Sequence, residues 1–291
     1  MSRGLDHIVH AVRDLDAAAE VYRRAGFLVG ARNRHPWGTH NRIVQLHNCY
    51  IELLEVAEPE KIVPHGARSF SFGAFNRDFV AQHEGFSMLI LHSRSATDDA
   101  RAFDAAGIGG FEVFDFAREG GRPDGTVVRL AFSLAFAADP ASPGLRFGVC
   151  QHHFPENFWD PAFQIHANGA KAVPGVVMVA DNPSDHHIFL KAFTGVSDLH
   201  SSSIGVRAAT SNGEVEIMEQ VAFRGQFGVL PDVGGEGMTL SGLRFAVADL
   251  ALTEALLRQN GIAAQSHGGR LVIPPDIAHG ATLIFEAAKE G

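Results

Sequence analysis

The pattern of apolar and polar positions divides the chain into four similar stretches. The first begins with an apolar run at residues 5–12, which predicts a buried strand, and continues with a helix that is apolar on one side. Asp14 or Asp16 can cap this helix, and Gly26 ends it before Phe27. The same order of strand, helix and Gly-apolar pair returns within residues 85–108, 173–196 and 240–262.

Short runs of strand character follow each Gly-apolar pair, among them residues 27–34, 111–116 and 214–223. The sequence therefore predicts an α+β fold of four βαβββ modules. One module leaves a face of its sheet uncovered, so modules must pair, and pairing makes a cleft. Because the Pro-rich stretch at 154–175 separates the second module from the third, we expect two paired-module domains, residues 1–160 and 161–291.

Composition narrows the classes of function. Hydrophobic residues make up 46% of the 291 residues, and the formal charge of −9 comes with scattered Lys and Arg, so no nucleic-acid partner is expected. The sequence contains neither a membrane-length apolar segment nor a signal-peptide pattern, which predicts a cytoplasmic protein without a membrane contact. Two cysteines do not make a disulfide framework, whereas sixteen histidines offer many ligands and bases.

Three segments of the first module carry a family resemblance: DHIVHAVRDL, HPWGTHNRIVQL and YIELLEV. They resemble the glyoxalase-like domain family of the vicinal oxygen chelate superfamily, which also includes glyoxalase I, extradiol dioxygenases and bleomycin-resistance proteins. The resemblance covers the whole chain in fold and the first module in motif. It implies one divalent metal ion, Fe, Zn, Ni or Mn, held in the cleft by first and last strands of the modules.

Carried over by position, the resemblance implies that His7 on the first strand and Glu52 on the last strand of the first module are metal ligands. The second module departs from the pattern. Where its first strand should supply a ligand it has Phe86 and Ser87, and neither is a good metal ligand.

The last strand of the second module, LRFGVCQHH, offers a third ligand. Alternation puts Cys150 and His152 on one face and His153 on the other. With His152, the set would be two imidazoles and one carboxylate, which suits Fe(II) or Zn²⁺. Cys150 and His153 stay open as alternatives for this position.

Two loops are expected to form the substrate walls, because they mix aromatic groups with short polar ones. The predicted substrate-binding residues are Trp37, Thr39, His40, Asn41 and Trp159. Glu52 and His153 are the expected catalytic groups, since a carboxylate or histidine near the metal would move protons.

Other candidates have simpler interpretations. His10 has the opposite parity to His7 and is expected to pack beneath the first helix, while His166 is expected to anchor the linker. His186 and His187 fit a solvated helix face. Glu286 occupies a last-strand position that resembles a ligand site, but its partner strands carry no histidine, so the C-terminal pair is expected to be structural or a homodimer surface.

The function expected from this sequence is that of a metal-dependent enzyme acting on a small molecule with two adjacent oxygens, as a glyoxalase-like lyase or isomerase. An extradiol-type Fe(II) dioxygenase is the alternative among enzymes. A metal-free small-molecule-binding protein of the bleomycin-resistance kind is the alternative from another class, and the incomplete second-module ligand set favours it.

Overall fold

The computed structural model describes residues 2–121, 125–232 and 236–288 of the chain. The N-terminal half consists of β1 (Leu5–Val12), α1 (Leu15–Arg24), β2 (Asn33–Arg34), β3 (Thr39–Gln45), β4 (Tyr50–Val56), η1 (Pro59–Lys61), α2 (Phe72–Gln82), β5 (Gly85–His92), α3 (Ala96–Ala105), β6 (Phe114–Gly121), β7 (Val127–Ala137), β8 (Arg146–His152), α4 (Pro155–Phe158) and η2 (Pro161–Gln164).

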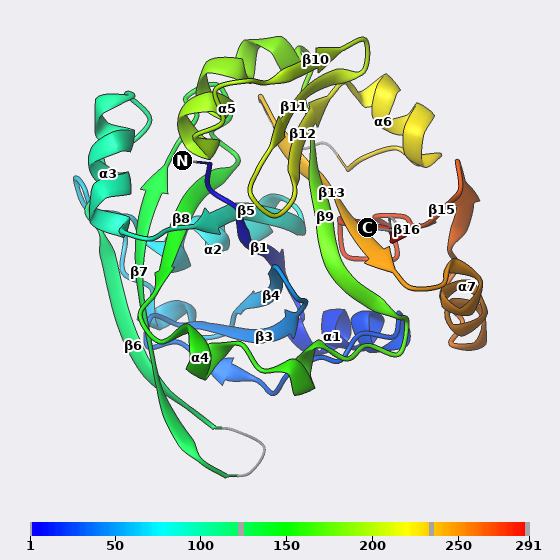
Figure 1. The fold of residues 1–291 in the computed structure, drawn as a ribbon. Helices are drawn as coiled ribbons and strands as arrows, with labels where there is room; N and C mark the ends of the chain where they lie inside the picture. The colour runs from blue at the N-terminus through cyan, green and yellow to red at the C-terminus, as the bar shows by residue number, and fades with distance from the viewer. Residues whose placement is uncertain (1, 122–124, 233–235, 289–291) are drawn as a thin grey trace.

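The C-terminal half consists of β9 (Ala170–Val179), η3 (Pro183–His186), α5 (His187–Thr194), β10 (His200–Ser202), β11 (Gly205–Ala209), β12 (Glu214–Met218), α6 (Gln220–Phe227), β13 (Thr239–Val247), α7 (Leu250–Gln259), β14 (Gln265–His267), β15 (Arg270–Ile273) and β16 (Thr282–Ala287). The order of one strand, one main helix and three strands recurs from β1, β5, β9 and β13 (Figure 1). The fold is mixed α+β, which confirms the predicted class.

Polar residues cap three of the predicted helices, and the first helix begins at Asp14, one of the two caps predicted for it. Asp14, Ser95 and Asp249 each accept hydrogen bonds from backbone N–H groups of the first helical turn, in α1, α3 and α7. Gly195 follows α5 with a left-handed φ of 70°, a conformation that glycine adopts without steric cost. None of the helices in the described ranges has the length and apolar character needed to cross a membrane.

Two predicted strands were too long, and helices α2, α4 and α6 were not predicted. Of residues 27–34 only Asn33–Arg34 forms a strand. Of residues 214–223, the strand ends at Met218 and α6 begins at Gln220, because Phe223 and Phe227, four residues apart, pack on one side of a helix. Helix α2, between β4 and β5, was not predicted from the sequence.

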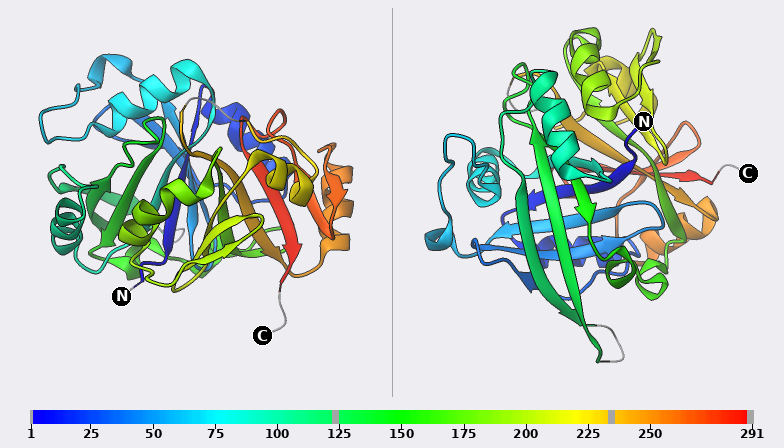
Figure 2. Two further views of the ribbon diagram at one scale, coloured as in Figure 1. Left: turned by 90° about the horizontal axis from the view of Figure 1, so that it is seen from above. Right: turned by 60° about the vertical axis from the view of Figure 1, so that its left-hand side comes forward.

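Antiparallel strand pairs join the modules. Strands β1 and β5 pair the first two modules, and β9 and β13 pair the last two. The halves meet in one continuous sheet through β5 and β13, where Phe86 lies opposite Leu240. Figure 2 shows the two halves side by side, with the long β6–β7 hairpin extending beyond the body of the first.

The two halves also share a hydrophobic core. Phe27, which follows α1, packs against Phe245 of β13 and Phe285 of β16, with ring centroids 4.9 and 5.9 Å apart. Between the halves, the predicted linker is tied to the first one: Gln45 donates to the Phe158 carbonyl, and His166 donates to the Gln45 carbonyl. His166 thus anchors the linker, as predicted, while the boundary at residue 160 stays a prediction.

His10 is fully buried beneath α1, as predicted. Its Nε2–H donates to the His279 carbonyl at 2.9 Å, and its Nδ1 lies 3.0 Å from the Tyr22 hydroxyl of α1. Burial lowers the pKa of His10 to about 4 from 6.5. The imidazole is therefore neutral in the folded protein at neutral pH.

This burial predicts a pH-dependent stability. The unfolded chain binds a proton at His10 below a pH of about 6.5, whereas the folded chain binds it only near pH 4. The contribution of His10 to the free energy of unfolding is therefore complete above pH of about 6.5 and falls as the pH decreases. A shift of this size lowers the free energy of unfolding by up to about 3 kcal/mol. Urea unfolding at several pH values should show a smaller acid loss in His10→Gln than in the wild type. An identical pH dependence in both proteins would contradict this, and exposed His200→Gln is the control.

An arginine occupies the concave face of the C-terminal half. The Arg244 guanidinium of β13 donates to three carboxylates: Glu214 at 3.2 Å, Glu216 at 2.5 Å and Glu286 at 2.7 Å. Arg270 also donates to Glu286, at 3.1 Å. The buried cation on β13 therefore holds together acidic groups from two other strands, β12 and β16.

Removing this cation should be costly. Arg244→Met would leave three carboxylates facing one another, so we expect a loss of about 3–5 kcal/mol of unfolding free energy at neutral pH. Arg207→Met is the matched control, because the half-exposed Arg207 makes a surface pair with Glu214 that is worth about 1 kcal/mol or less. Denaturant midpoints measure both, and equal losses would show that the buried network does not stabilise this half.

Candidate functional site

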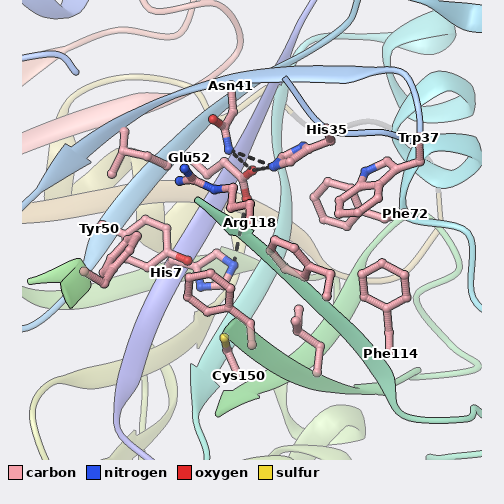
Figure 3. A pocket seen from close by; sticks show the side chains of 15 residues that line it. His7, His35, Trp37, Asn41, Tyr50, Glu52, Phe72, Phe114, Arg118 and Cys150 are labelled. Carbon is pink, nitrogen blue, oxygen red and sulfur yellow. Dashed lines mark hydrogen bonds and ion pairs between the residues drawn. The ribbon is translucent and has the colours of Figure 1, made fainter. Parts of the chain in front are cut away.

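His7 and Glu52 lie on neighbouring parallel strands and point to the same concave face. Val9 of β1 is opposite Glu52 of β4, and His7, two residues earlier, has the same parity. Both side chains are buried, and His7 Nε2 lies 4.0 Å from Glu52 Oε2 (Figure 3). The His7 ring stacks on Tyr50, with centroids 4.4 Å apart.

A β-bulge in β1 brings a second acidic group to this place. Leu5 pairs with Leu91 and His7 pairs with Ile90, so Asp6 is an extra residue between two consecutive partners on β5. The Asp6 carboxylate accepts a hydrogen bond from His7 Nδ1 at 2.6 Å. Because a carboxylate can only accept this hydrogen bond, His7 Nδ1 carries the ring proton. The lone pair of His7 Nε2 then points toward Glu52.

The same carboxylate binds His152. His152 Nε2 lies 3.1 Å from Asp6 Oδ2, and its Nδ1 is buried with no hydrogen-bond partner among the described residues. Burial alone would raise the pKa of Asp6, but attraction to His152 and hydrogen bonds from His152 and His7 outweigh it, so that pKa lies below its usual value. Asp6 is therefore a charged group between two imidazoles.

The other oxygen of Glu52 faces the first loop. Asn41 Nδ2 donates to Glu52 Oε1 at 2.6 Å, and His35 Nε2 lies 3.9 Å from the same oxygen. Asn41 Nδ2 also lies 3.3 Å from His35 Nε2, and His35 Nδ1 lies 2.8 Å from the Thr39 hydroxyl. Burial lowers the pKa of His35, so this ring is a neutral imidazole whose Nε2 can accept a proton.

These groups line a pocket between the two N-terminal modules. Aromatic rings make most of its walls. The lining residues are His7, His35, Trp37, Asn41, Ile43, Tyr50, Glu52, Phe72, Phe114, Phe116, Arg118, Phe132, Leu134, Cys150 and Phe158. The pocket thus combines an apolar enclosure with a small polar cluster, as small-molecule sites do.

The predicted substrate-binding residues have different places. Trp37 and Asn41 line the pocket. Thr39 is buried and holds His35, and Trp159 stacks beside His152 with centroids 5.9 Å apart. His40 points to the opposite face of β3, where it lies 3.3 Å from Glu58, so it is outside this pocket. A role for any of the five in substrate binding stays a prediction.

His153, the predicted catalytic histidine, lies on the other face of β8. Its Nε2 is 2.7 Å from the Ser133 hydroxyl, which in turn donates to Asp115, and the side chain is exposed. This geometry separates His153 from Glu52. His152, on the concave face, is bound to Asp6 and does not face Glu52 directly.

The divalent metal ion that the fold family implies can be tested against these donors. His7 Nε2 and Glu52 Oε2 face each other at 4.0 Å without a hydrogen bond between them, and two ligand bonds of about 2.1 Å span up to about 4.2 Å. An imidazole nitrogen fixed by a carboxylate on its other side is the usual arrangement of a histidine ligand. His7 and Glu52 therefore fit a divalent cation.

A second group of potential ligands lies behind His7. Oxygen of Asp6, sulfur of Cys150 and nitrogen of His152 lie within 4.8 Å of one another. Burial, and then the charges of Asp6 and Glu52, raise the pKa of the Cys150 thiol well above its usual value, which opposes the thiolate that a metal needs. Because Asp6 also already accepts from two imidazoles, this group fits a cation less well than His7 and Glu52.

Strand register locates the equivalent positions in the other modules. In each module, the position of His7 lies seven residues before the N-cap of the first helical segment, α1, α3, η3 or α7. The four residues at this position are His7, Met88, Gly175 and Gly242. The position of Glu52 corresponds to Gly148, Glu216 and Ile284, each opposite the equivalent of Val9. Met88, rather than Phe86 or Ser87, thus occupies the first-strand position of the second module, and Ile284, rather than Glu286, the last-strand position of the fourth.

In the C-terminal half a guanidinium fills the corresponding place. Arg244 Nη1 lies 3.1 Å from where a Cβ on Gly175 would be, and it binds Glu216, the equivalent of Glu52. The carboxylate is present here, but the cation belongs to the chain itself. The expectation that this half is structural or a homodimer surface stays a prediction.

Sequence analysis missed four groups of the site. Asp6 was hidden because a bulge changes parity, and His35 because it lies in an irregular loop. Tyr50 was predicted to lie in a strand, but not to take part in the site. Phe114, Phe116 and Arg118 are spaced two residues apart, so strand alternation places them on one face. Arg118 was missed because the predicted strand ended at residue 116.

Comparisons with known proteins place this geometry in a family. A model of the glyoxalase-like domain matches residues 5–194. A solved structure of a hypothetical protein from Staphylococcus aureus is 14% identical, with a TM-score of 0.65 over 98% of this chain and 99% of its own. No curated protein matches the chain.

Two further solved structures share the fold at low identity. A mutant of 4-hydroxymandelate synthase from Streptomyces coelicolor is 11% identical, with a TM-score of 0.58 over 100% of this chain and 94% of its own. A xylose isomerase-like TIM barrel/4-hydroxyphenylpyruvate dioxygenase fusion protein is 12% identical, with a TM-score of 0.55, and the chain covers 49% of its length. With the family match over more than half of its length, the chain belongs to the glyoxalase-like domain family.

Proposed function

We propose that this protein is a metal-dependent enzyme that acts on a small molecule with two adjacent oxygen atoms, as a lyase or isomerase. The observation that carries the proposal is the opposed pair of His7 Nε2 and Glu52 Oε2, 4.0 Å apart in a largely aromatic pocket. A divalent ion bound there would supply Lewis acidity toward the substrate oxygens. His7 and Glu52 would hold it and leave its remaining positions to the substrate.

Other residues of the site prepare these two donors. Asp6 keeps the His7 proton on Nδ1, so that Nε2 stays available. Asn41 holds Glu52 Oε1 and leaves Oε2 turned to His7. The neutral imidazole of His35, 3.9 Å from Glu52, is placed to accept a proton from a bound molecule at Nε2. The aromatic walls exclude water and strengthen each of these interactions.

Metal content tests the proposal. Purified protein should bind about one divalent ion per chain, and both His7→Ala and Glu52→Gln should lose it, because each removes one of two donors. His47→Ala is the matched control, since His47 is an exposed histidine of the same module. Elemental analysis after stripping and reloading measures this. If the wild-type protein holds no metal and the His7→Ala variant binds the ligand with the same affinity, the protein is instead a metal-free binding protein.

Asp6 should affect metal affinity without being a ligand in this arrangement. In Asp6→Asn the charged partner of His7 is lost, so we expect metal affinity to fall about 10- to 100-fold, the usual effect of removing an outer partner of a histidine ligand. Metal titration monitored by calorimetry measures the change. Complete loss of binding, as in His7→Ala, would mean that Asp6 itself is a ligand.

An Fe(II) dioxygenase is the second candidate, favoured by the names of two similar structures, a dioxygenase fusion protein and a hydroxymandelate synthase. Their 11–12% identity supports the fold alone. Oxygen consumption by the iron-loaded protein with catechol as a probe separates the candidates. Turnover that needs oxygen favours the dioxygenase, and turnover of a substrate without oxygen favours the lyase or isomerase.

A further inference from the structure

Arg118 brings a positive charge into the pocket. Phe114, Phe116 and Arg118 alternate along β6, and all three line the pocket. The alternate positions Asp115, Ala117 and Glu119 are exposed on the other face. In Figure 3, Arg118 reaches in beside Glu52 and Tyr50, and Phe72 and Phe114 stand at the other end of the pocket. The guanidinium therefore shares the pocket with the proposed metal donors.

This guanidinium is largely without partners. Its one hydrogen bond within the described part of the chain goes from Nη1 to the carbonyl of Glu119, at 3.3 Å, and none of the described carboxylates lies within 4.0 Å of it. Burial lowers the pKa of Arg118, which shows that the charge is partly removed from water. Arg244, in the corresponding cleft, is instead surrounded by three carboxylates. A guanidinium has five N–H donors, so most of those of Arg118 are available to a bound molecule.

The charges of the site favour a single anion. Asp6 and Glu52 carry one negative charge each, and a bound divalent cation would balance both. The positive charge of Arg118 is then left unbalanced. A ligand with one carboxylate would neutralise it, and a planar carboxylate fits the two parallel N–H donors of a guanidinium.

The walls favour a flat apolar body for this ligand. Trp37 lies with Phe114 and Phe116, each at 5.2 Å between centroids and nearly perpendicular, and Phe116 stacks on Phe132 at 5.0 Å. Such rings offer both faces and edges to an aromatic guest. In addition, the Trp37 indole N–H is buried with no hydrogen-bond partner among the described residues, so a ligand oxygen could satisfy it.

We propose that this pocket binds a single-ring aromatic molecule with one carboxylate, the carboxylate on Arg118 and the ring among the aromatic walls. The inference rests on the proposed function for the divalent cation and extends it by naming the chemical class of the substrate.

Benzoate and its neutral analogue benzamide test this class of ligand. Calorimetric titration of the metal-loaded protein should show benzoate binding, with benzamide at least about tenfold weaker, because a charged hydrogen bond is lost. Arg118→Met should weaken benzoate about 10- to 100-fold and leave benzamide unchanged, and Arg118→Lys should fall between the two because it keeps the charge without the fork. Acetate, which lacks the ring, should bind too weakly to measure.

The controls separate this inference from the proposed function. Arg129→Gln removes an exposed arginine from the other face of the same hairpin and should bind benzoate like the wild type. Metal content and thermal midpoint of Arg118→Met should equal those of the wild type. Equal affinities for benzoate and benzamide, or unchanged benzoate binding in Arg118→Met, would overturn the inference even if the metal is bound. Arg118-dependent benzoate binding by a protein that holds no metal would support the inference and refute the metal-dependent function.

Discussion

The site depends on one buried contact, the hydrogen bond from His7 Nδ1 to the Asp6 carboxylate. In a regular strand these neighbours would point to opposite faces, and only the bulge lets both reach the same side. A buried carboxylate is costly unless its acceptor sites are occupied, and here two imidazoles occupy them. The cost of burying Asp6 thus fixes the direction of His7, and with it the lone pair that faces Glu52.

The four modules show how one backbone position can serve different purposes. The first module has His7 and Glu52, the second Met88 and Gly148, and the third Gly175 and Glu216. In the C-terminal pair the Arg244 side chain takes the space next to Gly175 and neutralises Glu216. The same concave geometry that could hold a metal ion in one half therefore holds a built-in cation in the other. This explains why an acidic cleft there is stable.

Much of the fold follows from local signals, whereas the site does so only in part. Caps such as Asp14 and strand alternation predict the helices and the central strands, because both depend on neighbouring residues. His7 and Glu52 were found through a family resemblance. Asp6 and His35 were not, since a bulge and an irregular loop obey no period. The sequence also did not determine which face of β8 points inward. A shift of register by one residue would turn His153 inward in place of Cys150 and His152.

The two N-terminal modules contribute unlike parts to one pocket. The second module has Gly148 at the position equivalent to Glu52, where a Cβ would be crowded, 3.1 Å from the Ile90 side chain and 3.2 Å from the Ala135 carbonyl. It supplies instead the β6–β7 hairpin, whose pocket-lining residues are Phe114, Phe116, Arg118, Phe132 and Leu134. The metal donors therefore come from the first module, whereas both modules supply walls. Since β1 and β5 are paired side by side, the relative position of donors and walls is set by the sheet itself rather than by a mobile loop.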